Sequence, residues 1–391
     1  MSARAATWRS PTDPSNISAH QEALCQALCY IKTSNSIVEN ALRFFREFLL
    51  TLRQLKVDDA LAEGLPSMLT RQSIAENHLE KADLLLYAAP LQGYTEAEWR
   101  HYHAEMFGGV DTYYIPFMRV EKGTVRNKDM REITSPLNPA AIPTVPQVLV
   151  RDSGELRILA DAIVAAGHRD IDINMGCPFA PQVKHGRGSA LLASPAALES
   201  LACEMRKRYA DVRFSVKMRL GVTDAAQWRD VIGIINSMPL THLTVHPRTA
   251  SQQYEGELAM DEFAALMEES AHPVVFNGNI ITPQDIDTLT QTYPRLHGIM
   301  AGRGLLTRPS LMAEWRSGEE WDAPRRLRTV MSLHDAIYES YQTRLCGDAQ
   351  LLSKIKPFWD YHAEAIGHKA AKAIKKATSV QKYEAAVATI R

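Results

Sequence analysis

The chain has 391 residues, of which 46% are hydrophobic and 23% are charged, a globular composition that excludes wholesale disorder and a fibrous repeat. It carries 44 Lys and Arg against 45 Asp and Glu, which excludes a globally basic nucleic-acid binder but leaves a local basic patch open. No run of about 18 apolar residues exists, and the first residues lack the apolar core of a secretory signal, so we expect no membrane-spanning helix and no membrane partner.

Residues 1–82 are predicted to form a helical N-terminal extension. The apolar residues of segment 37–56 recur at helical spacing, and a second helical stretch covers about 66–83. This extension carries no recognisable chemical motif, so its role stays open.

Residues 83–321 alternate between short apolar runs and amphipathic helical segments. The runs, rich in β-branched and aromatic residues, are 84–89, 112–118, 144–150, 170–174, 213–218, 241–246, 273–277 and 297–301. The helical segments between them are 94–107, 152–166, 192–209, 225–237, 259–270 and 283–292. This α/β alternation predicts a (β/α)8 TIM barrel, with 119–143 as a long functional loop between its second and third strands.

Residues 322–391 are predicted to form a separate helical domain. Its segment 354–382 holds seven lysines against two carboxylates, and Lys369, Lys372 and Lys376 fall on one helical face. A basic surface on a near-neutral protein suits the phosphate backbone of RNA, and the alternative is a merely solvated helix face.

Polar residues stand at the ends of nearly all the predicted strands, which is where a TIM barrel places its active site. They are the loop 90–93, Arg119, Gln147, Asn174, Lys217 with Arg219, His246, the loop 277–279 and the loop 302–304. Any one of them could be structural, but the set indicates a functional site.

The loops 277–279 (NGN) and 302–304 (GRG) follow the last two predicted strands, where this fold often binds phosphate. Glycine lets backbone N–H groups approach a phosphate, and the guanidinium group of Arg303 can bind two phosphate oxygens at once. The sequence has no GxGxxG motif between a strand and a helix. A site for a single phosphate, together with a lysine at the mouth of the barrel, therefore favours the mononucleotide FMN as cofactor. Lys217 would then face the pyrimidine edge of the reduced flavin.

The five cysteines, at 25, 29, 177, 203 and 346, lack the paired spacing of a disulfide scaffold or a zinc ribbon. They favour a reducing, cytoplasmic compartment and no metal site. Cys177 differs from the others because it follows the fourth predicted strand in the turn N-M-G-C-P. A thiol with an ordinary pKa of about 8.5 is mostly protonated at neutral pH and can donate a proton.

Several ordered segments resemble the dihydrouridine synthase family. Residues 174–178 (NMGCP) and 184–192 (KHGRGSALL) resemble the family signature, and 89–95 (APLQGYT) resembles its first-strand motif. The blocks 216–221 (VKMRLG), 244–249 (TVHPRT), 254–256 (YEG), 277–280 (NGNI) and 302–304 (GRG) match the family in order and spacing. The resemblance covers about 84–385.

The resemblance implies an enzyme that reduces the C5–C6 double bond of uridine in folded RNA, usually tRNA, with FMN and NADPH. Carried over by position, Cys177 would protonate C5 while the reduced flavin delivers hydride to C6. The residues that would hold FMN are Pro90, Leu91, Gln147, Lys217, His246, Asn277, Gly278, Asn279, Gly302 and Arg303. Those that would contact the everted uracil or the RNA are Arg119, Asn174, Arg219, Tyr254, Lys354, Lys369, Lys372 and Lys376. We expect a monomer.

The sequence departs from the family pattern in its long N-terminal extension, in the charged loop 119–143, and at Pro247, where the family often has glycine. These departures leave the RNA target open. Two other functions remain at this point: an FMN barrel that acts on a free small molecule such as a pyrimidine, and a non-enzymatic RNA-binding protein with a vestigial barrel. The cysteine at 177 and the intact loops count against the second.

Overall fold

The computed structural model describes residues 84–390. The two helical segments predicted at 37–56 and 66–83, together with Cys25 and Cys29, lie outside the described residues. None of the helices within 84–390 is both long enough and apolar enough to cross a bilayer.

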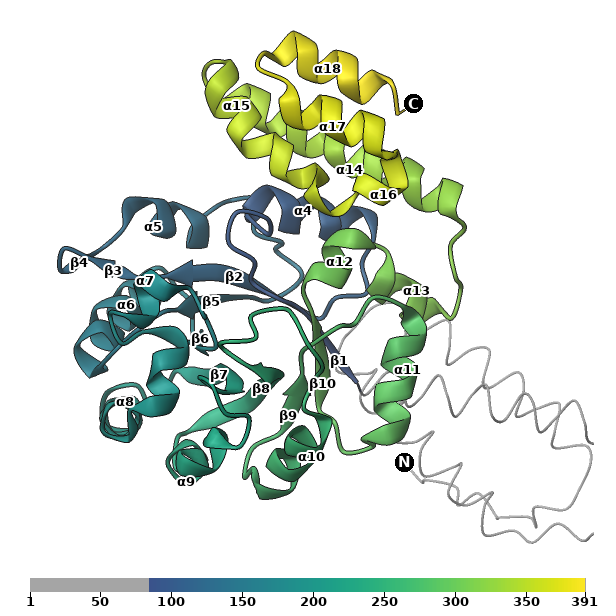
Figure 1. Cartoon of the computed structure of the whole chain (residues 1–391). Helices are drawn as coiled ribbons and strands as arrows, with labels where there is room; N and C mark the ends of the chain where they lie inside the picture. Colours follow the sequence, from purple (N-terminus) through teal and green to yellow (C-terminus); the bar gives the residue numbers. More distant parts are fainter. Residues whose placement is uncertain (1–83, 391) are drawn as a thin grey trace, which may run out of the picture. The chain divides into compact units, whose positions relative to one another are not determined.

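Eight parallel strands close into a barrel (Figure 1). They are β1 (Leu85–Ala88), β2 (Thr112–Met118), β5 (Thr144–Val148), β6 (Asp170–Met175), β7 (Arg213–Gly221), β8 (Leu240–Thr249), β9 (Val274–Phe276) and β10 (Gly298–Ala301). Each strand pairs with the next one of this series, and β10 pairs with β1 to close the ring. Each of the predicted strands coincides with one of these, so the predicted TIM barrel is confirmed.

Helices cover the outside of the barrel (Figure 1). They are α4 (Ala97–Met106), α6 (Ser153–Ala165), α8 (Pro195–Arg208), α9 (Ile232–Asn236), α10 (Met260–Glu269), α11 (Pro283–Thr292), α12 (Arg303–Thr307) and α13 (Leu311–Ser317). Sequence signals explain their bounds: Asp152 caps α6, and Thr282 with Asp285 forms a capping box at the start of α11. The helix predicted over 225–237 is divided into η4 (Gln227–Asp230) and α9.

The segment 119–143 is more regular than the loop predicted from its charges and prolines. It folds into the short antiparallel hairpin β3 (Val120–Glu121) and β4 (Thr124–Val125), followed by α5 (Asn127–Ile133). Lys122 and Gly123 both have positive φ, as a two-residue hairpin turn requires. The prediction underrated this turn because the flanking strands are only two residues long.

The inward side chains divide the barrel interior into layers, because alternate residues of each strand face inward. The layer at the amino ends is sealed by a cluster that includes Tyr87, Tyr114, Val275 and Met300. The ring of His242 stacks on Tyr87 and its Nε2 lies 2.9 Å from Tyr114 Oη. The charged inward residues therefore lie above this aromatic layer, toward the carboxyl ends, where the site was predicted.

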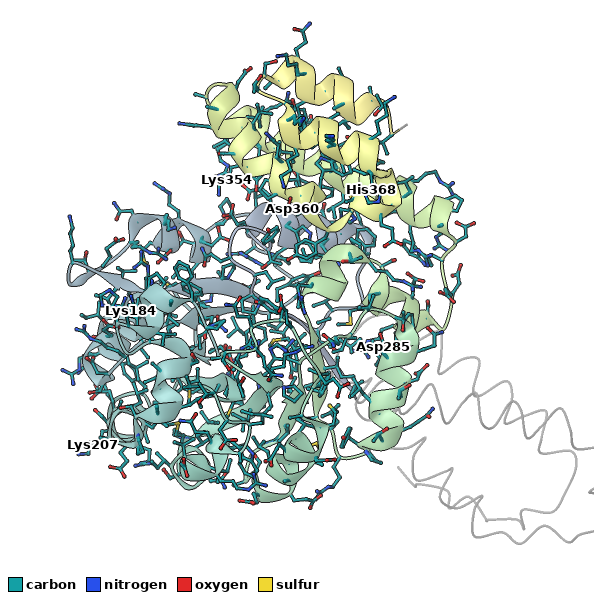
Figure 2. All side chains as sticks on the ribbon, viewed as in Figure 1. Lys184, Lys207, Asp285, Lys354, Asp360 and His368 are labelled. Carbon is teal, nitrogen blue, oxygen red and sulfur yellow. The ribbon has the colours of Figure 1, made fainter. Side chains whose placement is uncertain are left out.

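The C-terminal region is helical, as predicted. It comprises α14 (Ala323–Arg344), α15 (Asp348–Ile355), η5 (Lys356–Tyr361), α16 (Ala363–Ile366), α17 (His368–Lys376) and α18 (Val380–Ala388). Its core is fixed by Tyr383, whose hydroxyl accepts a hydrogen bond from Trp359 Nε1 at 2.8 Å and lies 2.6 Å from His334 Nε2. These helices contact the barrel at α4 and the loop before it, where Lys354 pairs with Glu96 and Tyr94 donates to Asp360 at 3.0 Å. Figure 2 labels Lys354 and Asp360 at this side of the helices.

Two glycines give a matched test of barrel packing. A Cβ added at Gly304, in α12, would lie 1.7 Å from the Ile280 carbonyl oxygen, whereas one added at Gly233, in α9, would meet nothing within 4 Å. We expect Gly304→Ala to lower the free energy of unfolding by about 1–3 kcal/mol or more, because backbone must move. Gly233→Ala should change it little or raise it by up to about 1 kcal/mol. Urea denaturation measures both, and equal effects would contradict the packing described for α12.

Candidate functional site

Strand register brings the predicted site residues together at the carboxyl end of the barrel. Asn174 on β6 lies beside Lys217 on β7, and Arg219 on β7 lies beside His246 on β8. The loops of β1, β9 and β10 close the ring: a Cβ at Gly278 would lie 3.4 Å from His246 Cδ2, and one at Gly302 would lie 3.7 Å from a methyl carbon of Leu91. The structure thus gathers residues of six strand ends around one opening, which we call the barrel mouth.

Four cationic side chains share the barrel mouth. They are Lys217, Arg219, Arg248 and Arg303. Arg219 donates to the carbonyls of Gly176 (3.0 Å) and Thr249 (2.8 Å). Arg303 lies with its guanidinium carbon 4.2 Å from the centre of the Tyr254 ring.

Arg248 donates to the carbonyls of Gly256 (2.7 Å) and Glu255 (3.1 Å) and to Asn279 Oδ1 (3.2 Å). It thereby ties the segment that carries Tyr254 to the loop after β9. Within residues 84–390, none of the four cations forms an ion pair with a carboxylate.

The protonation of the barrel mouth reflects this crowding of positive charge. Burial first and the Arg219 charge second lower the pKa of Lys217 to about 8, although Asp172 and Cys177 oppose the shift. Burial and the charges of Lys217, Arg219, Arg248 and Arg303 hold the pKa of His246 well below its usual range. His246 is therefore neutral at physiological pH, and the remaining positive charge favours an anionic ligand.

Two further features mark the barrel mouth as a ligand site. Thr244 Oγ1, buried on the inward face of β8, has no hydrogen-bond partner among the described residues. Lys217 likewise has no hydrogen bond or ion pair within 84–390. Buried polar groups are normally satisfied, so donors left free beside unpaired cations point to a ligand that completes them. His/Cys/Asp/Glu clusters of the kind that hold metal ions do not occur in the described part of the chain.

Cys177 lies in a turn whose shape is fixed from two sides. Asn174 Oδ1 accepts the backbone N–H groups of Gly176 (3.0 Å) and Cys177 (2.8 Å). On the other side, Gly188 has φ of +64° and approaches so closely that a Cβ there would lie 2.9 Å from Cys177 Cβ. Burial raises the pKa of the Cys177 thiol, against the lowering effects of the Phe179 backbone and of Arg219 and Lys217. The half-buried thiol therefore carries its proton at neutral pH.

Arg187 anchors the segment that follows the cysteine. Its Nε donates to Glu155 Oε2 at 2.8 Å, a second guanidinium nitrogen pairs with Glu155 Oε1, and the Val120 carbonyl accepts a further bond. Both charged side chains are buried, so this bidentate pair fixes the segment against α6. It also connects the cysteine loop to the β3–β4 hairpin.

Other predicted residues lie away from the barrel mouth or are already engaged. Arg119 is 3.7 Å from Glu121, and its backbone N–H donates to Asp129. Lys354 forms its ion pair with Glu96 of the barrel. The exposed lysines of α17 are Lys369, Lys372, Lys375 and Lys376. Within residues 84–390, none of these four lysines forms a hydrogen bond with a predicted site residue of the barrel mouth.

Sequence reasoning missed Arg248, Asp172, Ser215 and Thr244. The signal was available, because inward residues recur every second position: Asp172 precedes Asn174, Ser215 precedes Lys217, and Thr244 precedes His246. On β6 and β8 the prediction stopped at Asn174 and His246 and did not include the inward residues two positions before them.

Comparisons with known proteins agree with this geometry. Residues 87–389 match the model of a family described as dihydrouridine synthase (Dus). A probable tRNA-dihydrouridine synthase 2 of Bacillus subtilis is 27% identical, over 63% of this chain and 77% of that protein. A tRNA-dihydrouridine(16) synthase of Cupriavidus necator is 28% identical over 71% and 90%, and a tRNA-dihydrouridine synthase B of Pseudomonas putida is 28% identical over 61% and 71%. Because the family match spans most of the chain and includes the whole barrel mouth, the chain belongs to the dihydrouridine synthase family of enzymes.

Proposed function

We propose that this protein reduces the C5–C6 double bond of uridine in RNA, most readily tRNA, with FMN as cofactor and NADPH as reductant. The observation that carries the proposal is the barrel mouth, where cations without carboxylate partners and the unsatisfied Thr244 hydroxyl share one opening, and where the charges of Lys217 and Arg219 act on the protonated thiol of Cys177. The names of the relatives support the choice of tRNA as substrate.

The donor set fits FMN. The glycine loops 277–279 and 302–304, with Arg303 and Arg248 beside them, suit a phosphate, and Lys217 and Gln147 suit the polar edge of a flavin ring. The backbone of Pro90 and Leu91 borders the same opening. When bound in its reduced form, FMN supplies the hydride for C6 of the uracil.

Cys177 supplies the proton for C5 in this proposal. Its raised pKa keeps the thiol protonated until the transfer, and its turn holds it at a fixed place beside β6. Hydride at C6 and a proton at C5 together account for the two hydrogens added to the double bond, and the thiolate left behind regains its proton from water.

The uracil must leave the base stack to reach the barrel mouth, at a cost of a few kcal/mol. Arg219 keeps guanidinium N–H groups beyond the two that bind backbone carbonyls, and we assign it to the uracil oxygens and to the negative charge that develops during reduction. Asn174 has one amide N–H left for the base, since its other polar groups bind the turn and Gln147. Tyr254 is 47% exposed at the rim, and we place it and Arg119 against the base or its neighbours.

We assign the RNA backbone to the C-terminal helices. Lys372 and Lys375 of α17, together with Lys356 and His368, line a groove of about 710 Å³ that is floored by apolar side chains such as Ile374. Exposed ammonium groups beside such a groove suit phosphates. We therefore propose 83–321 as the catalytic domain and 322–391 as the RNA-binding domain of a monomeric cytoplasmic enzyme.

Cys177→Ala should keep FMN but lose uridine reduction, because the variant removes the proton donor while leaving the barrel mouth intact. We expect a loss of about 10²–10⁴-fold in the rate of dihydrouridine formation. Cys203 is a half-buried cysteine of α8, away from the barrel mouth, so Cys203→Ala is the matched control and should retain full turnover. Nucleoside mass spectrometry measures the product and flavin absorbance the cofactor; unchanged turnover of Cys177→Ala would remove the acid role.

The triple variant Lys369→Ala, Lys372→Ala, Lys376→Ala should bind tRNA more weakly and with a smaller salt dependence, because fewer counterions are released. The slope of log K against log salt should become shallower by about 2–3. Lys207→Ala, which removes an exposed lysine of α8 (labelled in Figure 2), should leave the slope unchanged. Filter binding over a salt series measures both, and equal slopes for wild type and triple variant would show that these lysines are only solvated.

A further inference from the structure

A chain of hydrogen bonds connects a fully buried carboxylate to the cysteine turn. Asp172 on β6 accepts Gln147 Nε2 at 2.7 Å and Ser215 Oγ at 2.7 Å. Gln147 Oε1 in turn accepts Asn174 Nδ2 at 2.7 Å. Asn174 Oδ1 then accepts the backbone N–H groups of Gly176 and Cys177. The chain of Asp172, Gln147 and Asn174, which we call the amide relay, runs from the middle layer of the barrel to the turn.

The two ends of the amide relay determine its direction. A side-chain amide has nearly the same shape when its oxygen and nitrogen are exchanged, so shape alone does not orient Gln147 or Asn174. An acceptor at Asp172 requires Gln147 to present Nε2 to it and therefore Oε1 to Asn174. Asn174 must then present Nδ2 to Gln147 and Oδ1 to the turn. If Asn174 were reversed, its Nδ2 would face the Gly176 and Cys177 N–H groups, donor against donor. If Gln147 were reversed, its Oε1 would face the Asp172 carboxylate and its Nε2 would face Asn174 Nδ2.

We propose that Asp172 is a positioning residue for Cys177: as the terminal acceptor of the amide relay, it holds Asn174 in the orientation that fixes the cysteine turn. Asp172 is too deep to meet a substrate at the barrel mouth, since it is 0% exposed and lies two residues below Asn174. The inference rests on the proposed function in one respect, namely that the turn carries Cys177, the proposed proton donor. The geometry of the turn is measurable without RNA, reductant or turnover.

A second role for Asp172 makes a different prediction. The Lys217 charge acts on Asp172 from the neighbouring strand, so the carboxylate could serve chiefly as a counter-charge for the lysine. A counter-charge needs the negative charge, whereas the amide relay needs only an acceptor. Asp172→Asn removes the charge but keeps an oxygen for Gln147, because its Nδ2 can donate to the Ser215 hydroxyl. Asp172→Leu removes both.

Hydrogen–deuterium exchange of the Gly176 and Cys177 amides, resolved by residue in the full-length protein, tests the proposal. Asp172→Leu should speed exchange at these two amides by on the order of tenfold, since losing the acceptor removes about the free energy of one buried hydrogen bond. Asp172→Asn should exchange within about threefold of wild type. The amides of 171–173 in β6 should be unchanged in both variants, which separates a loosened turn from a loosened strand.

Gln147→Met removes the middle of the amide relay and keeps the test valid if Asp172→Leu does not fold. It should speed exchange at Gly176 and Cys177 as Asp172→Leu does. Ser215→Ala leaves the bond from Gln147 to Asp172 in place and should match wild type. Wild-type exchange in Asp172→Leu or Gln147→Met would overturn the proposal, as would equal acceleration in Asp172→Asn and Asp172→Leu.

Discussion

Positive charge without a carboxylate partner is the constraint on which the barrel mouth depends. Lys217, Arg219, Arg248 and Arg303 converge there. The partners of the three arginines in the described structure are backbone carbonyls, the Asn279 amide oxygen, His246 Nε2 and the ring of Tyr254. Burial is the largest cause that lowers the pKa of Lys217 to about 8 and that of Arg219 to about 10, and the neighbouring positive charges lower both further toward these values. An anion bound among them would relieve this repulsion, which supports our proposal that the barrel mouth binds a phosphorylated cofactor.

The layer beneath the cations completes the arrangement. Asp172 is the acidic group that acts on Lys217, and burial raises its own pKa to about 6 although Gln147, Ser215 and Lys217 oppose the shift. Below it the aromatic cluster of Tyr87 and Tyr114 closes the barrel to solvent. Polar side chains can therefore be held in fixed orientations by one another, because water has little access from the amino ends of the strands. The same rigidity extends to the cysteine turn through Asn174 and Gly188.

Much of this could be predicted from the sequence because the fold repeats a simple pattern. Eight apolar runs alternating with helical segments determine a barrel, and a barrel gathers its strand ends, so Asn174, Lys217 and His246 could be placed together from their positions alone. Gly304 shows that a motif does not by itself give the reason for each of its residues. Gly304 belongs to the GRG loop, but it must be glycine because a Cβ there would collide with the Ile280 carbonyl, and no phosphate is needed to explain it. Arg248 was missed because its role depends on backbone carbonyls at 255 and 256, and carbonyls carry no signature in a sequence. Lys354 was grouped with the other lysines by charge, whereas the structure engages it with Glu96, a contact that only the packing of α15 near α4 creates.

The dissociation constant of FMN, measured by flavin fluorescence at pH 7 and at pH 9 for wild type and Lys217→Met, tests most directly whether unneutralised charge organises the barrel mouth. The folded-state pKa of Lys217 is lowered to about 8, so the free protein carries this charge at pH 7 and loses most of it at pH 9. Wild-type affinity should therefore fall across this interval, by up to about tenfold per pH unit above 8. Lys217→Met should bind more weakly at pH 7 and show no such fall. A wild-type affinity independent of pH, or one matched by the variant at pH 7, would contradict the account.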